Sequence, residues 1–198
     1  LTIPKLKNIN FMGGETLLTK RFEEFVDFFI HHKRFDISFS FVTNGTHFNQ
    51  QLLDKLKKFA RVGIEVSIET NSLHNSYVRQ GTNTDLVLAN IQKYKENSNN
   101  TNITTTLRPA ISALTVGYYY TLLDYCLEHK LLIKSLLVTI PTHLNVNVLP
   151  IAVRQGYLAS YNQLLDKVNQ FDIAVDFNES DPNNYVGSIK TPVSYTHL

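Results

Sequence analysis

The sequence predicts an α/β domain with a parallel sheet, spanning residues 1–178. Apolar stretches typical of strands alternate with amphipathic helical stretches at intervals of about 30 residues, as in right-handed βαβ crossovers. Because 43% of its 198 residues are hydrophobic, the chain can bury a core of ordinary size. Polar residues follow the expected strands, at the edge of a parallel sheet where βα proteins bind ligands.

The first strand, over residues 6–11, runs into the turn Gly13, Gly14 and Glu15. Two adjacent glycines leave the main chain open to a ligand because they carry no Cβ, and a glutamate beside them accepts hydrogen bonds from an ammonium or hydroxyl group. Alone, a glycine pair after a strand is more often a plain turn. Apolar residues at helical spacing then predict an amphipathic helix over residues 19–33.

The second strand, over residues 37–42, ends in Thr43, Asn44 and Gly45. The Thr-Asn-Gly sequence is by itself a common turn. Leucines at helical spacing then predict a helix between Leu52 and Phe59, and Asn49 is placed to cap it.

The third strand, over residues 63–68, brings Ser67 and Glu69 to its C-terminal end. Since they are two apart on a strand, they are expected to point to the same face. A long connection through Arg79 leads to a helix that opens near Thr84, where threonine and aspartate suit a helix start. Without other support, Ser67 could be a cap and Arg79 a surface ion pair.

The remaining elements continue the alternation after a polar turn at residues 95–102. Arg108 follows the fourth strand, and Pro141 ends the fifth. The expected elements are a strand at 103–107, a helix at 114–129, a strand at 133–140, a helix at 152–171 interrupted near Gly156, and a short strand at 172–177.

Composition argues against several classes of partner. The 19 basic and 17 acidic residues leave a formal charge of +2, too small to indicate nucleic acid or a membrane surface. No stretch approaches the ~20 apolar residues of a membrane span. Cys126 is the only cysteine, which excludes an internal disulfide and fits a reducing, cytoplasmic compartment. The histidines share no ligand spacing, so no metal site is expected.

The strand-end residues together resemble the radical S-adenosylmethionine (radical SAM) superfamily, most closely members with peptide-modifying relatives. The resemblance implies a partial (βα)6 TIM-like barrel and extends over residues 6–150. The matching residues are Gly-Gly-Glu after the first strand, Thr-Asn-Gly after the second, and Val66-Ser67-Ile68-Glu69 followed by His74, Arg79 and Gly81-Thr82.

The resemblance also implies roles for these residues in binding S-adenosylmethionine. The Gly13-Gly14-Glu15 segment would bind the methionine amino group. Ser67 and Glu69 would hold the carboxylate and the ribose, although many relatives have aspartate where this chain has Glu69.

Two arginines are candidates for the methionine carboxylate. Arg79 matches an arginine that can reach it, where a planar guanidinium fits bidentately, and Arg108 competes for that role. Thr43 and Asn44 complete the expected cofactor-binding set, and no catalytic residue is assigned.

One family feature is missing from this sequence. The family binds a [4Fe-4S] cluster through a Cys-x3-Cys-x2-Cys loop after the first strand, which a single late cysteine cannot supply. Cys126 lies on an apolar helix face, where a buried structural role is expected. We therefore expect a fragment that lacks the first βα unit and is inactive alone. Residues 179–198 are expected to be a tail, of which 192–198 follow no earlier pattern and are taken as non-native.

The expected function is that of a fragment of a radical SAM enzyme. The complete parent would reduce the sulfonium from its cluster and release methionine and a 5′-deoxyadenosyl radical that abstracts hydrogen, with a peptide or protein as candidate substrate. The alternative is a noncatalytic α/β nucleoside-binding module that has lost the cluster. A metal-independent TIM-type enzyme is disfavoured because no acid/base pair stands out. A Cys-x3-Cys-x2-Cys stretch encoded upstream would favour the enzyme over the binding module.

Overall fold

The computed structural model describes residues 5–170, and side chains as far as residue 166. The strand expected at residues 172–177 and the tail expected at 179–198 lie outside this range. The chain forms two compact units. The first unit contains the described residues up to Ile68 together with residues 81–107, and the second contains residues 69–80 and the described residues from Arg108 onward.

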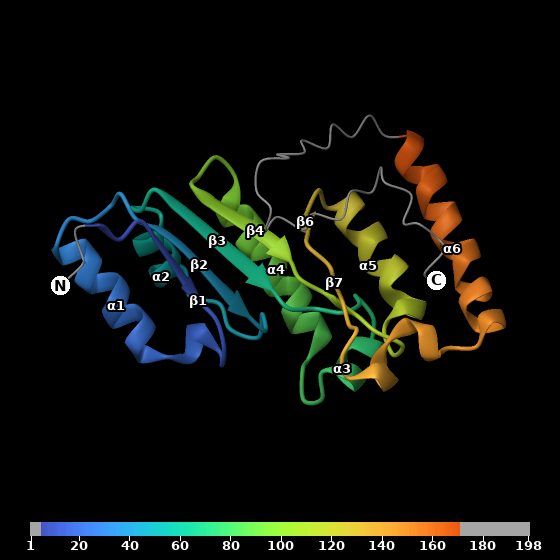
Figure 1. The fold of residues 1–198 in the computed structure, drawn as a ribbon. Helices are drawn as coiled ribbons and strands as arrows, with labels where there is room; N and C mark the ends of the chain where they lie inside the picture. Colours follow the sequence, from blue (N-terminus) through green and yellow to red (C-terminus); the bar gives the residue numbers. More distant parts are fainter. Residues whose placement is uncertain (1–4, 171–198) are drawn as a thin grey trace. The chain divides into compact units, whose positions relative to one another are not determined.

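The first unit is built on four parallel strands in the order β1-β2-β3-β4, as Figure 1 shows. They are β1 (Asn8–Phe11), β2 (Ser38–Thr43), β3 (Arg61–Val66) and β4 (Ile103–Leu107). This confirms the α/β class and the parallel sheet predicted from sequence. The fourth strand has the predicted bounds, whereas the first and third are shorter than expected.

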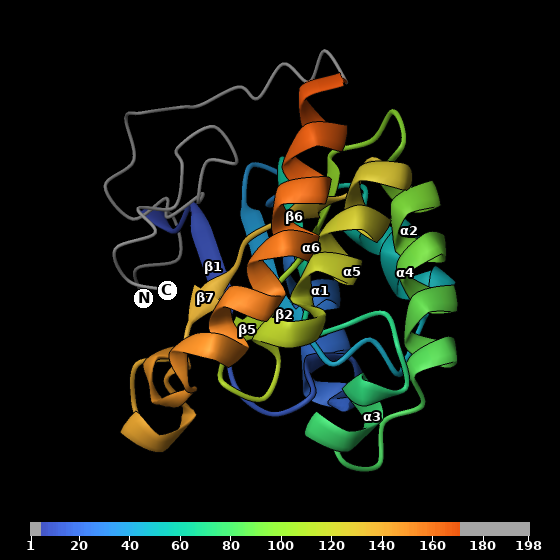
Figure 2. The ribbon, with the colours of Figure 1, turned by 90° about the vertical axis from the view of Figure 1, so that its right-hand side faces the viewer.

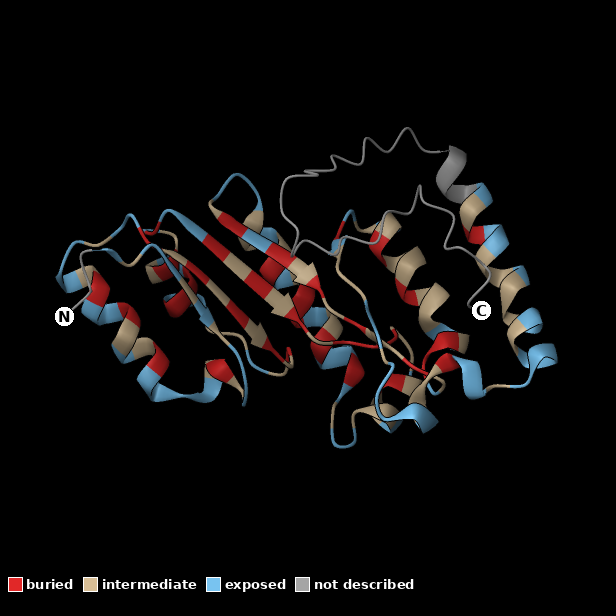
Figure 3. Cartoon of the chain, viewed as in Figure 1, coloured by how far each residue is buried: buried red, intermediate tan, exposed pale blue. Residues whose placement is uncertain are grey.

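Side chains alternate along these strands between a buried and a more open face (Figure 3). Phe41 of β2 lies beside Ile64 of β3, and both are fully buried. The opposite face carries Ser40 beside Gly63, which in turn lies beside Thr104. A parallel sheet packed on both faces normally has continuous apolar strands. The alternation here therefore leaves a polar face on one side of the sheet.

Three helices complete the first unit: α1 (Lys20–His31), α2 (Gln50–Leu56) and α4 (Thr84–Ser98). Their apolar sides join the buried strand residues, and phenylalanines make several edge-to-face contacts, including Phe22 with Phe41 and Phe39 with Phe59. A short 3-10 helix, η2 (Thr16–Leu18), precedes α1. The sequence pattern did not indicate it.

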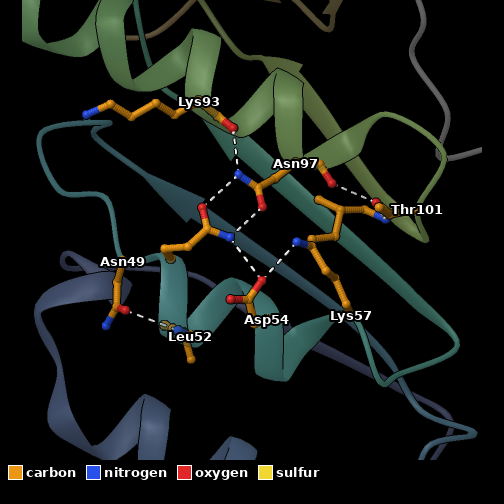
Figure 4. A network of polar contacts seen from close by, with 9 residues as sticks. Asn49, Leu52, Asp54, Lys57, Lys93, Asn97 and Thr101 are labelled. Carbon is orange, nitrogen blue, oxygen red and sulfur yellow. Dashed lines mark hydrogen bonds and ion pairs between the residues drawn. The ribbon is translucent and has the colours of Figure 1, made fainter.

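Helices α2 and α4 are tied together by side-chain amides (Figure 4). Gln50 donates to the Asn97 carbonyl oxygen at 2.8 Å, and Asn97 donates back at 3.1 Å. Gln50 also donates to Asp54, which forms an ion pair with Lys57. Asn97 belongs to α4, which runs on to Ser98, so the polar turn expected from residue 95 begins later than predicted.

Helix starts in this unit use asparagine caps. The Asn49 side chain accepts from the Leu52 amide, as predicted. Asn83 does the same for the Leu86 amide, whereas the sequence analysis looked to threonine and aspartate. Each cap satisfies an amide that has no partner within its helix.

The second unit contains α3 (His74–Val78), α5 (Val116–Glu128) and α6 (Ile151–Gln170), with α5 and α6 in contact (Figure 2). Gly117 permits this approach, since a Cβ there would lie 2.6 Å from the Tyr157 ring. Helix α6 continues through Gly156, so the predicted interruption is wrong. Neighbouring turns of α6 hold the backbone at that glycine in a helical conformation.

The strand expected at residues 133–140 is wrong in length. It divides into β6 (Leu132–Ile133) and β7 (Leu136–Leu137), and β7 pairs in parallel with β5 (Ala110–Ile111). The 3-10 helices η3 (Thr142–Leu144) and η4 (Val146–Val148) follow. An apolar run alone does not reveal where a strand breaks.

Candidate functional site

The glycine pair lies just beyond the end of β1 with its backbone bare. Gly13 has φ of 93° and Gly14 φ of 63°, a left-handed conformation that side-chain-bearing residues rarely adopt. Both residues are exposed, and a Cβ built on either would meet no atom within 4 Å. The main chain at this strand end is therefore open to an incoming ligand.

Glu15 joins the ends of β1 and β2 through its carboxylate. One oxygen accepts from the Thr43 hydroxyl at 2.6 Å, and the other accepts from the Asn44 amide at 2.7 Å. The Leu17 amide also donates to it at 3.3 Å, which caps η2. A carboxylate has about four acceptor positions, so three are in use. The sequence motifs Gly-Gly-Glu and Thr-Asn-Gly are thus brought together, with Glu15 fixing their geometry.

The Thr43-Asn44-Gly45 turn is rigid. The Thr43 hydroxyl oxygen accepts from the Gly45 amide at 3.1 Å, and the Asn44 side-chain oxygen accepts from both the amide and the hydroxyl of Thr46. Gly45 has φ of 73°, and a Cβ there would lie 2.9 Å from methyl groups of Val66 and Val87. The turn therefore requires glycine for both conformation and space.

Two residues of α4 hold this turn from the core side, and neither was singled out from sequence. Asn90 is 2% exposed and donates to the Gly45 carbonyl at 2.9 Å. Tyr94 is fully buried and donates from its hydroxyl to the His47 carbonyl. Burial, with a smaller contribution from the Glu15 charge, raises the pKa of Tyr94. The available signal was an asparagine on the apolar side of a helix, beside Ile91.

Ser67 follows β3, and its amide donates to the Thr43 carbonyl at 2.9 Å. It lies partly buried, beside the turn that Glu15 holds. Since β3 ends at Val66, the alternation used to place Ser67 and Glu69 on one face does not extend to them, and that argument is wrong. The first unit therefore brings the glycine pair, Glu15, Thr43, Asn44 and Ser67 to neighbouring strand ends.

Glu69, Arg79 and Arg108 belong to the second unit. The Glu69 side chain is only 5% exposed and forms an ion pair with Arg79 at 2.8 Å. Its other oxygen accepts from the Ala110 amide. Arg79 and Glu69 are therefore partners of each other. Arg108 follows β4 directly and is partly buried.

The described residues do not fit a [4Fe-4S] cluster. Cys126 is 4% exposed on α5, and burial raises the pKa of its thiol from 9.0 to about 12. Cluster ligation needs several thiolates, and the sequence holds one cysteine. Within residues 5–170 there is also no group of three histidine, cysteine, aspartate or glutamate side chains that could hold a metal ion. Across that same range, the helices are all too short or too polar to cross a membrane.

A sequence model of the Radical SAM superfamily matches residues 2–113. None of the curated proteins matches the chain. Solved structures with the same fold include SuiB from Streptococcus suis bound to S-adenosylmethionine, with a TM-score of 0.56 and 13% identity over 82% of this chain and 36% of SuiB. The same protein bound to its precursor peptide SuiA gives a TM-score of 0.55 and 14% identity, over 82% of this chain and 36% of SuiB.

A second solved protein shares the fold. The enzyme anSMEcpe with bound AdoMet gives a TM-score of 0.55 and 15% identity, over 83% of this chain and 43% of anSMEcpe. With bound AdoMet and the Cp18Cys peptide, it gives a TM-score of 0.51 and 17% identity, over 66% of this chain and 37% of that protein. The chain thus spans well under half the length of these proteins.

Proposed function

The chain belongs to the radical SAM superfamily, and we propose that it supplies the S-adenosylmethionine-binding strand ends of a radical SAM enzyme. The cofactor-binding residues in this proposal are Gly13, Gly14, Glu15, Thr43, Asn44, Ser67, Glu69, Arg79 and Arg108. The backbone of the glycine pair would meet the methionine amino group, and Glu69 would meet the ribose.

The observation that carries this proposal is the exposed, left-handed glycine pair beside a carboxylate already fixed in place. Gly13 and Gly14 present main-chain atoms with no side chain in front of them. Glu15 is held by Thr43 and Asn44, so the loop has one geometry before any ligand arrives. A preset polar loop loses less conformational freedom on binding than a mobile one.

The cluster ligands in this proposal come from outside residues 1–198, since Cys126 is the only cysteine in this sequence. When bound by such a segment, the cluster supplies the electron for reductive cleavage of the cofactor, which yields methionine and a 5′-deoxyadenosyl radical for hydrogen abstraction. The residues of this chain bind and orient the cofactor.

A peptide or protein is the substrate class we propose. Support comes from two proteins that share the fold, one solved with the precursor peptide SuiA and the other with the Cp18Cys peptide. The polar face of the sheet in the first unit, with Ser40 and Thr104, offers hydrogen-bonding groups to such a substrate.

The test uses the complete protein that carries this chain, reconstituted anaerobically with iron and sulfide and reduced with dithionite. We expect methionine and 5′-deoxyadenosine in equal amounts from added S-adenosylmethionine. Binding of S-adenosylmethionine without cleavage, in a protein whose full coding sequence lacks Cys-x3-Cys-x2-Cys, would instead support the noncatalytic nucleoside-binding module. Neither binding nor cleavage would reject both functions.

A further inference from the structure

The carboxylate of Glu69 is enclosed by fixed donors. Its Oε1 accepts from Arg79 Nε at 2.9 Å and Nη2 at 2.8 Å. Its Oε2 accepts from the Ala110 amide. We call Glu69, Arg79 and the Ala110 amide the Glu69 clasp. It joins the segment after β3, the end of α3 and the first residue of β5.

The backbone around the Glu69 clasp is also fixed. The Glu69 amide donates to the Asn75 side-chain oxygen at 2.9 Å, and the Arg79 amide donates to the Asn75 carbonyl at 2.8 Å. Asn75 is fully buried. Residues 69 and 79 are therefore held through both backbone and side chain, so the carboxylate has little freedom to turn toward a ligand.

Counting acceptor positions limits what Glu69 can bind. An ionised carboxylate has about four, and the Glu69 clasp fills three of them. Both oxygens already carry donors, with two on Oε1 and one on Oε2. The remaining position lies on Oε2 and admits one further donor.

We propose that Glu69 accepts a hydrogen bond from one ribose hydroxyl of S-adenosylmethionine, and that Arg79 is the positioning residue that orients it. This inference rests on the proposed function. It gives Arg79 a task other than the methionine-carboxylate contact that the family resemblance implies. Because both donors of Arg79 converge on one oxygen, a lysine keeps the charge but loses the two-donor geometry.

The test titrates the complete protein anaerobically with S-adenosylmethionine and with its 2′-deoxy and 3′-deoxy analogues. We expect about tenfold weaker binding for one analogue, the loss of one hydrogen bond to a charged group, and unchanged binding for the other. In Arg79→Lys, the difference between the two analogues should largely disappear. The control is Arg61→Lys, because Arg61 is exposed at the start of β3, and it should behave as wild type.

Two results would overturn the inference. Equal weakening of both analogues in the wild type would show that Glu69 does not select a single hydroxyl. Uniform weakening of all three ligands in Arg79→Lys, with the selectivity retained, would show that Arg79 contacts the methionine end.

A thermal arm separates this inference from the proposed function. Unfolding temperatures of Glu69→Gln, Arg79→Lys and the double variant should be non-additive, with the second substitution costing less once the first is present. Non-additive unfolding in a protein that binds no S-adenosylmethionine would uphold the Glu69 clasp while rejecting the cofactor role. Additive temperatures would reject the Glu69 clasp itself.

Discussion

Glu15 illustrates how one side chain fixes the candidate site. Its two carboxylate oxygens accept from the Thr43 hydroxyl and the Asn44 amide, so the loop after β1 and the turn after β2 move together. Hydrogen bonds to an ionised acceptor are stronger than neutral ones. The residue therefore contributes to stability as well as to the site.

Glu15→Gln should destabilise the protein, because the amide NH2 of glutamine cannot accept from the Asn44 amide. We expect a loss of about 1–3 kcal/mol in the free energy of unfolding, measured by urea denaturation. Glu24→Gln is the control, since Glu24 is exposed and forms only a 3.7 Å pair with Lys20. Equal stabilities of the two variants would contradict the role given to Glu15.

Cys126 should react slowly with a thiol reagent in the folded protein. Burial raises the pKa of its thiol to about 12, so almost no thiolate exists at neutral pH. The unfolded chain ionises near the ordinary value of 9.0. This thiol's contribution to stability is therefore fully present below pH 9 and is lost as the pH rises towards 12. Iodoacetamide labelling at pH 8, with and without urea, measures the difference, and equal rates would show that the thiol is accessible.

At the scale of elements, the turn after β2 depends on the close approach of β3 and α4. Gly45→Ala would place a methyl group 2.9 Å from Val66 and Val87 in a left-handed backbone. We expect a loss of about 2–4 kcal/mol in unfolding free energy, from overpacking and from the backbone conformation together.

Gly81→Ala provides the matched control for that prediction. Gly81 has φ of 85°, but a Cβ there would meet no atom within 4 Å, so only the conformational cost of about 1–2 kcal/mol applies. Urea denaturation of both variants compares them. A smaller loss for Gly45→Ala than for Gly81→Ala would show that the turn has room for a side chain.

Sequence patterns predicted the first unit well and the second poorly. Strands such as β4 and the Asn49 cap follow from local periodicity and capping, which depend on near neighbours. The division of residues 133–140 into β6 and β7, and the continuity of α6 through Gly156, depend on tertiary packing that periodicity does not contain.

The candidate site divides in the same way. Strand-end motifs indicated Gly13, Gly14 and Glu15 because glycine pairs and carboxylates have recognisable chemistry. The support from Asn90 could not be predicted, since its partner, the Gly45 carbonyl, lies 45 residues away in the chain. The pairing of Glu69 with Arg79 was also missed, because each had been considered separately as a cofactor ligand.

At the scale of the whole molecule, the chain with residues 1–198 should not assemble an iron–sulfur cluster. Its one thiol is buried and protonated, and clusters are held by several thiolates. Anaerobic reconstitution followed by iron and sulfide analysis of the desalted protein checks this. Stoichiometric iron that is lost in Cys126→Ala would contradict it.

The most direct test of the central claim is the affinity of the complete protein for S-adenosylmethionine when valine replaces one exposed glycine. Gly14 and Gly81 both have positive φ and open space around them, so valine imposes similar backbone strain at either position. We predict that Gly14→Val abolishes binding and cofactor cleavage with little effect on the fold, whereas Gly81→Val binds as wild type. Wild-type affinity in Gly14→Val, measured by anaerobic titration, would contradict the assignment of this strand end to the cofactor.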